Sequence, residues 1–212
     1  MQKIIIALAF LVCSVAAQSQ TDSAIVITPG VGIGKLKLGM SEKTAARILG
    51  GKIEWVSYTE ELKSFTSDDT QIDSVLQFII GFDSCGRYNS ELPEKLPVFS
   101  LYFKDHKLNF ITVSSYSAPA EQVERVNVTN GLKFHMPMDE CTAILGEEYV
   151  SLTYGDYTGD HYYYKLGLEA VYDDGVLTAI GIFPSTPNYK TLIAQRSAEI
   201  KKQVADVLAG KE

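Results

Sequence analysis

The chain has 212 residues, of which 46% are hydrophobic and 21% charged, a composition typical of a globular protein rather than a disordered one. Acidic residues outnumber basic residues, so the formal net charge at pH 7 is −7. This charge argues against nucleic acid and anionic membranes as partners, because both attract clustered positive charge.

The N-terminus is typical of a secretory signal peptide. A basic residue precedes an apolar run over residues 4–12, and Val15–Ala17 supplies the small side chains that signal peptidase reads. We therefore expect residues 1–17 to be removed and the protein to be exported, either to the periplasm or as a secreted protein. The branched Val12 disfavours lipoprotein anchoring through Cys13. No stretch of the chain approaches the roughly 20 apolar residues of a transmembrane helix.

A glycine-rich approach leads into the first predicted helix. Ser41 fits an N-cap, the helix is expected over Glu42–Leu49, and Gly50 is a stop signal. Strands are expected at Ile53–Tyr58, Val75–Phe82, Val98–Phe103 and Leu108–Ser114. The polar stretch Thr59–Ser74 and the proline-containing stretch Asp83–Pro97 are expected to be loops.

The second half predicts a similar succession of elements. Its helix is expected over Met138–Leu145, behind Pro137 and before Gly146. Strands are expected at Tyr149–Tyr154, His161–Tyr164, Leu168–Tyr172 and Val176–Phe183. An amphipathic helix over Tyr189–Ala209 closes the chain, and its apolar side is expected to pack on a sheet.

The two halves also share sequence. Residues 36–50 read LKLGMSEKTAARILG and residues 132–146 read LKFHMPMDECTAILG, an alignment without gaps at an offset of 96. The final hairpins align at an offset of 69, so the first half carries about 27 extra residues between helix and hairpin. Self-similarity of this kind is typical of a duplicated supersecondary unit.

We therefore predict an α+β fold of two tandem repeats, each a short helix followed by an antiparallel β-meander, plus the C-terminal amphipathic helix. The expected divisions are residues 1–17 for the signal peptide, 18–120 for repeat 1, 121–186 for repeat 2 and 187–212 for the C-terminal helix.

Three segments carry a resemblance to a known fold family, namely Gly34–Ser41, Ile48–Gly50 and Tyr164–Ile180. The pattern resembles the tandem α+β modules of the β-lactamase-inhibitor-protein-like fold, and more loosely the BamE-type outer-membrane assembly lipoproteins. The resemblance covers both repeats, from about residue 33 to residue 183, and implies the fold rather than the function. One cysteine per repeat does not allow the disulfide that the inhibitor has inside each module, so β-lactamase inhibition is not carried over.

Two cysteines remain after the expected cleavage, Cys85 and Cys141. Cys141 lies three and four residues before Ile144 and Leu145, which places it on the apolar stripe of its helix and predicts a buried thiol. A disulfide between Cys85 and Cys141 stays open as an alternative, because export leads to oxidising surroundings.

The candidate chemical groups form no recognisable catalytic or metal-binding motif. The histidines, His106, His135 and His161, lack the spacing of metal ligands, and the aspartates fit turns better than an EF-hand loop. Cys85 has no activating neighbour in sequence. We therefore expect no metal, no cofactor and no catalytic residue.

Tyrosines over residues 149–172 form the clearest candidate for a binding surface, because tyrosine combines an apolar body with a polar tip. Alternate strand residues face opposite ways, so about half of these tyrosines should point into the core. The alternative is ordinary packing of the sheet; if the protein is a binder, we expect Tyr157 in its loop and Tyr163 on its strand to face outward and to bind the partner.

The leading hypothesis is an exported, non-catalytic module that binds another protein or a component of the cell envelope. The alternative is a small exported hydrolase whose site is formed by the inserted loops of repeat 1, from Asp83, Glu91 and His106. Convergent carboxylates or histidines in a cleft would favour the hydrolase, whereas a tyrosine-lined sheet surface would favour the binding module. The partner and the oligomeric state stay open.

Overall fold

The computed structural model describes residues 25–50, 53–66, 76–88, 98–115, 123–153 and 158–209. The expected signal peptide over residues 1–17, including Cys13, lies outside these ranges, as do Glu91 and Tyr157.

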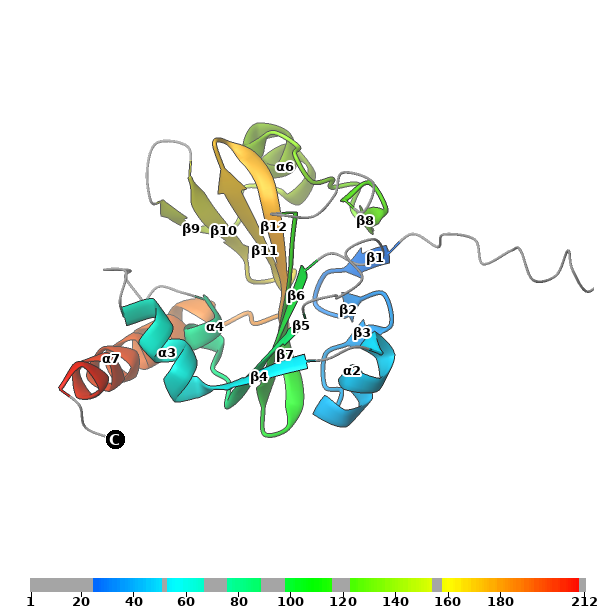
Figure 1. Ribbon diagram of the computed structural model, residues 1–212. Coiled ribbons are helices and arrows are strands. Elements are labelled where there is room, and N and C mark those ends of the chain that lie inside the picture. Colours follow the sequence, from blue (N-terminus) through cyan, green and yellow to red (C-terminus); the bar gives the residue numbers. More distant parts are fainter. Residues whose placement is uncertain are drawn as a thin grey trace, which may run out of the picture.

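An antiparallel sheet of eight strands forms the centre of the molecule (Figure 1). Its order is β4-β5-β6-β7-β12-β11-β10-β9, so the last strands of the two halves, β7 and β12, lie side by side in the middle. The strands are β4 (Ile53–Ser57), β5 (Ser84–Tyr88), β6 (Val98–Lys104), β7 (Lys107–Ser114), β9 (Val150–Thr153), β10 (Gly159–Tyr163), β11 (Leu168–Asp173) and β12 (Val176–Ile182).

A smaller sheet has the order β3-β2-β1-β8. Its strands are β1 (Ile25–Thr28), β2 (Gly32–Ile33), β3 (Leu36–Lys37) and β8 (Val126–Val128), and β8 pairs with β1 in the parallel direction. In this sheet, the start of the first half of the chain therefore pairs with the start of the second half.

Two short helices begin and end where the sequence predicts. They are α2 (Glu42–Leu49) and α6 (Met138–Leu145). At the start of α2 the Thr44 backbone N–H donates to Ser41 Oγ at 3.3 Å, and Gly50 ends the helix with a φ of 66°. This N-cap satisfies a backbone donor that the first helical turn leaves free.

Helices or small strands cover both faces of the large sheet. On one face, α2, α6 and the small sheet enclose an apolar core. On the other face, a second core lies under α3 (Tyr58–Thr66), α4 (Leu76–Ile80) and the C-terminal α7 (Tyr189–Leu208). Figure 1 shows these three helices grouped together at one end of the sheet.

Equivalent backbone features of the two halves are separated by the same offsets as the aligned sequences. The hairpins β6–β7 and β11–β12 each change register once, between Tyr102 and Phe103 in the first and between Val171 and Tyr172 in the second. Isolated bridges join Ser41 to Lys107 and Pro137 to Val176. Each bridge connects the residue before a short helix to the first residue of the central strand of the same half.

The inserted region of the first half differs from the sequence prediction. The expected strand Val75–Phe82 contains the helix α4, the expected loop Thr59–Ser74 begins with most of α3, and the expected loop Asp83–Pro97 begins with β5. A short apolar run such as Leu76–Ile80 fits a buried helix as well as a strand, so periodicity alone does not separate the two. The strand β5 was not predicted, because its sequence, SCGRY, begins with small residues that are not typical of strands.

Candidate functional site

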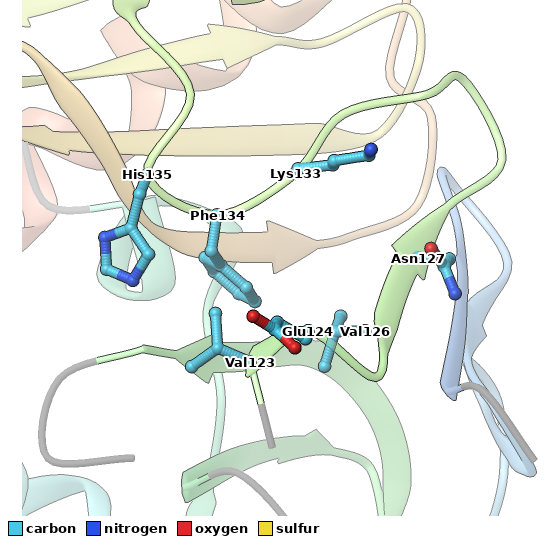
Figure 2. Close-up of a pocket in the computed structure, with 7 residues that line it drawn as sticks. All are labelled: Val123, Glu124, Val126, Asn127, Lys133, Phe134 and His135. Atoms are coloured by element: carbon cyan, nitrogen blue, oxygen red, sulfur yellow. The ribbon is translucent and has the colours of Figure 1, made fainter. Parts of the chain in front are cut away.

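A cavity of about 490 Å³ opens beside β8, and we call it the β8 cavity. Its lining residues come from two stretches, one leading into and along β8 and the other following it (Figure 2): Val123, Glu124, Val126, Asn127, Lys133, Phe134 and His135. This volume lies within the range of roughly 300–1,000 Å³ that is usual for small-ligand sites.

The lining of the β8 cavity combines three apolar side chains with four polar or charged ones. Val123, Val126 and Phe134 are 7%, 3% and 8% exposed. Figure 2 shows the Phe134 ring directed toward the segment that carries Val123, Glu124 and Val126.

Contacts to both sheets hold the two stretches in place. β8 pairs with β1, and the Gly131 N–H donates to the Val128 carbonyl at 2.8 Å in the turn that follows. The His135 N–H then donates to the Leu177 carbonyl of β12 at 2.8 Å. His135 has a φ of 64°, a left-handed conformation that only glycine adopts without strain. This turn directs the His135 side chain outward, where it is exposed.

The polar side chains that line the β8 cavity can hold a ligand through charge and hydrogen bonds. Glu124, Lys133, Asn127 and His135 offer charge and hydrogen bonds, but they do not include an activated nucleophile with its base. Among the described residues, no group of three or more His, Cys, Asp or Glu side chains is placed to hold a metal ion.

A buried carboxyl group, Glu169, lies on the helix-covered face of the large sheet. It is 6% exposed, and burial raises its pKa well above the usual value, with the negative charge of Asp160 adding to the effect. Gly181 lies opposite on β12, where an added Cβ would overlap Glu169 Oε2. This carboxyl is enclosed by the fold rather than presented to a ligand.

A second buried carboxylate, Glu61, forms an ion pair with Arg87 on the same face. Glu61 is 2% exposed, whereas the Arg87 side chain is 43% exposed. Neighbouring Cys85 is fully buried, and its pKa is raised to about 12 by burial, with the Glu61 charge contributing. A thiol of this pKa stays protonated and is a poor nucleophile at neutral pH.

Both cysteines are buried free thiols, so the alternative of a Cys85–Cys141 disulfide is wrong. Cys141 belongs to the core under α6, and Cys85 belongs to the core under α3, α4 and α7, on the opposite face of the sheet. The expected burial of Cys141 is confirmed, and burial raises its pKa to about 11.

The expectation that Tyr163 faces outward is wrong, because its side chain is 1% exposed. Tyr162 and Tyr163 do point to opposite faces of β10, but each face is covered, so both are buried. Tyr163 packs beside Tyr149, with ring centroids 5.3 Å apart, and Tyr149 stacks on His161 at 4.0 Å. Tyr157 lies outside the described residues.

Only some of the residues considered for a hydrolase site lie near one another. Asp83 Oδ2 accepts the Asp105 backbone N–H at 2.6 Å, and His106 Nδ1 lies 3.7 Å from Glu42 Oε1. The His106 side chain is 90% exposed, so nothing shields a reaction there from water. Asp83 thus stabilises the β6–β7 turn, and Glu91 lies outside the described residues.

Sequence reasoning did not identify the β8 cavity, because its two lining stretches, 123–127 and 133–135, meet only when the chain turns back after β8. The available signal was weak: His135 occupies the position of a glycine in the first half, which points to an unusual turn. Glu169 had a clearer signal, since it is a charged residue between the apolar residues Leu168 and Ala170 of the strand sequence LEAVYD.

Comparison with known proteins does not assign a family. No family model matches the chain, and no curated protein matches it. A crystal structure of an extracellular protein containing an SCP domain from Bacillus anthracis str. Ames aligns with 74% of this chain and 46% of that chain, at 10% identity and a TM-score of 0.38. This chain therefore spans less than half of that protein, and a similarity at this level carries no argument about fold or function. None of the described helices is both long and apolar enough to cross a membrane.

Proposed function

We propose that this protein is an exported, non-catalytic module that binds a ligand or a segment of another protein in the β8 cavity. The observation that carries the proposal is the cavity itself, whose volume is usual for a small-ligand site and whose lining offers apolar, charged and hydrogen-bonding groups. Export is proposed from the signal-like residues 1–17, with the periplasm and the extracellular space both open as destinations.

We further propose that the two halves arose by duplication of one helix-and-meander unit. The shared sequence offsets, the symmetrical strand order and the equivalent register changes support this origin. The same features are consistent with the resemblance to the β-lactamase-inhibitor-protein-like fold. A function in inhibition is not part of the proposal.

Site-specific photo-crosslinking tests where binding occurs. A benzophenone amino acid would replace Asn127, an exposed residue that lines the cavity, in cells that express the full chain. The matched control would place the same group at Glu147, an exposed residue after α6 that does not line the cavity.

We expect a discrete crosslinked product from position 127 and none from position 147. Equal products from both positions, or a product from position 147 alone, would show that the β8 cavity is not the binding site.

A further inference from the structure

The equivalent helices α2 and α6 differ in how each begins. At the start of α2, Ser41 Oγ accepts the Thr44 backbone N–H. Pro137 occupies the equivalent position before α6 and provides no side-chain cap. A side-chain cap stabilises the first turn of a helix, so α6 begins with less support than α2.

Side-chain hydrogen bonds tie α2 to the large sheet. Ser84 Oγ of β5 donates to Glu42 Oε1 at 3.0 Å, and the Tyr88 hydroxyl of β5 donates to the Leu49 carbonyl at 3.1 Å. In the described part of the chain, the side chains of α6 donate only to carbonyls within Met136–Met138, at the start of their own helix. These bonds do not hold α6 on the sheet.

Tyr163 lies under α6 as Tyr88 lies under α2. Tyr88 pairs across its ladder with Phe99, and Tyr163 pairs with Leu168, the equivalent of Phe99 at the offset of 69. The Tyr163 hydroxyl is buried beside Thr142 of α6, but it makes no hydrogen bond of acceptable geometry with any described residue. The tyrosine that anchors α2 therefore has a counterpart that does not anchor α6.

Two further polar atoms under α6 are buried without a partner among the described residues, namely the Tyr172 hydroxyl and His161 Nδ1. Cys141 and Tyr163 lie beside the Tyr172 hydroxyl, again without the geometry of a hydrogen bond. Phe103 occupies the position of Tyr172 in the first half and has no hydroxyl to satisfy. The core under α6 thus contains unsatisfied polar groups where the core under α2 is apolar.

The helix α6 is also less deeply packed than α2. Ala45 and Leu49 of α2 are buried, whereas Cys141 is the buried residue of α6. Leu145, the equivalent of Leu49, is half-buried, and Ile144 is 40% exposed. Less apolar area is therefore returned to water when α6 leaves the sheet than when α2 does.

We propose that α6 is a lid, which opens locally while the sheets stay folded and so uncovers a floor made of His161, Tyr163 and Tyr172. Opening lets water reach their unsatisfied groups, which lowers the free energy of the open state relative to the closed one. The N-terminal end of α6 is the hinge, because the Met138 N–H donates to the Gly175 carbonyl of the β11–β12 turn at 2.9 Å.

Thiol labelling tests the lid in one molecule. Ala45→Cys in the mature protein places a thiol on α2 at the position that corresponds to Cys141 on α6, and mass spectrometry of peptides follows the reaction of each with iodoacetamide. Relative to the urea-unfolded protein, both should be protected, but Cys141 about tenfold less than position 45. Low urea should hardly change the rate at Cys141, because local opening exposes little surface.

Equal protection at the two positions would overturn the proposal. So would a rate at Cys141 that rises with urea as steeply as global unfolding does.

The equivalent tyrosines give a matched pair of variants with opposite expected effects. Tyr163→Phe should slow labelling of Cys141 by about threefold or more, because the closed state no longer buries an unsatisfied hydroxyl. Tyr88→Phe removes a hydrogen bond to α2 and should speed labelling at position 45 by about threefold. Faster labelling of Cys141 in Tyr163→Phe would show that the hydroxyl holds the lid closed and would overturn the proposal.

Amide hydrogen exchange of the unsubstituted mature protein repeats the comparison without the added thiol. Amides of α6 should exchange faster than those of α2, and the reverse order would overturn the lid. Neither measurement uses a ligand of the β8 cavity, so the crosslinking result at position 127 tests the proposed function separately.

Discussion

The two central hairpins have equivalent registers, and one of the cross-strand pairs at which they differ is informative. In β6–β7, Ser100 lies opposite Thr112, and both are half-buried. At the equivalent position of β11–β12, the buried Glu169 lies opposite Gly181. The second hairpin thus lacks a side chain on one strand, and the space that this leaves is filled by a carboxyl group from the other.

The fold of the hairpin therefore does not require a buried carboxyl group. The carboxyl is present because Glu169 is combined with Gly181. A hairpin with the same register and the same bulge forms with serine and threonine in these places. Glycine weakens a strand, and burial disfavours the ionised form of a carboxyl group. The second hairpin therefore has two destabilising features that the first one lacks. The following experiments test this comparison, beginning with the largest expected effect.

Gly181→Thr, which installs the residue of the first hairpin, should destabilise the protein by about 2 kcal/mol or more. The added Cβ would overlap Glu169 Oε2 and lie 2.7 Å from Phe110 Cε2, and overpacking of this kind typically costs about 1–3 kcal/mol. Urea denaturation measures the loss. The double variant with Glu169→Ser should recover part of it, and an equal loss in both backgrounds would show that the carboxyl is not the obstacle.

Glu169→Gln should stabilise the protein at neutral pH and have little effect in acid. Below the usual carboxyl pKa both the folded and unfolded chains hold the proton. Above it the unfolded chain ionises while the raised pKa of buried Glu169 keeps the folded chain protonated, so wild-type stability falls with rising pH until the folded pKa is reached. Each unit of raised pKa corresponds to about 1.4 kcal/mol.

Thermal unfolding of the Glu169→Gln variant at several pH values checks this sign. The melting temperature at pH 7 should rise by about 3 °C or more, with the difference disappearing toward pH 3. The matched control Glu147→Gln, at an exposed position, should show no such trend. A constant difference at all pH values would mean that lost packing, and not ionisation, sets the effect.

Gly39→His should cost about 1 kcal/mol. Gly39 has a φ of 82°, and its equivalent in the second half, His135, holds a φ of 64°. An added Cβ at Gly39 would meet nothing within 4 Å, so the variant tests backbone conformation alone, which disfavours a side chain by roughly 1–2 kcal/mol. Gly39→Ala is the control for the imidazole in denaturant titration. A loss with His but not with Ala would point to the side chain instead.

Cys141→Ala should have the smallest effect, less than about 1 kcal/mol. Alanine occupies the equivalent position of the first half, Ala45, and both residues are fully buried. Because Cys141 and Cys85 are free and buried, thiol labelling of the native protein should be much slower than labelling in urea. Rapid labelling of Cys141 in the native protein would contradict the packing of α6.

The sequence predicted those elements that have local signals. The N-cap Ser41 and the stop at Gly50 define α2, and Pro137 and Gly146 do the same for α6. Turn residues and alternation located the strands of both closing hairpins. The C-terminal helix α7 followed from its amphipathic pattern, and it does pack on one face of the sheet through Tyr189 and Ile200.

Other features depend on contacts between distant segments and could not be predicted in this way. Tyr163 was placed outward on the assumption that one sheet face meets water, but both faces are covered. The short apolar run of α4 is also typical of a strand, and its contact with α7 cannot be recognised from the sequence. The parallel pairing of β8 with β1 likewise joins segments that lie far apart in the sequence.

The helix layer has a consequence for the order in which this protein can fold. The Tyr58 hydroxyl donates to Gln203 Oε1 at 2.6 Å, and Arg196 Nη2 donates to the Phe78 carbonyl at 3.4 Å, contacts that span 145 and 118 residues. Since α7 is synthesised long after α3 and α4, Phe78 and its neighbours on these two helices stay uncovered until α7 is available. Contacts this distant in sequence form slowly, and exposed apolar surface promotes aggregation in the meantime. The newly made chain is therefore prone to aggregation until α7 packs against α3 and α4.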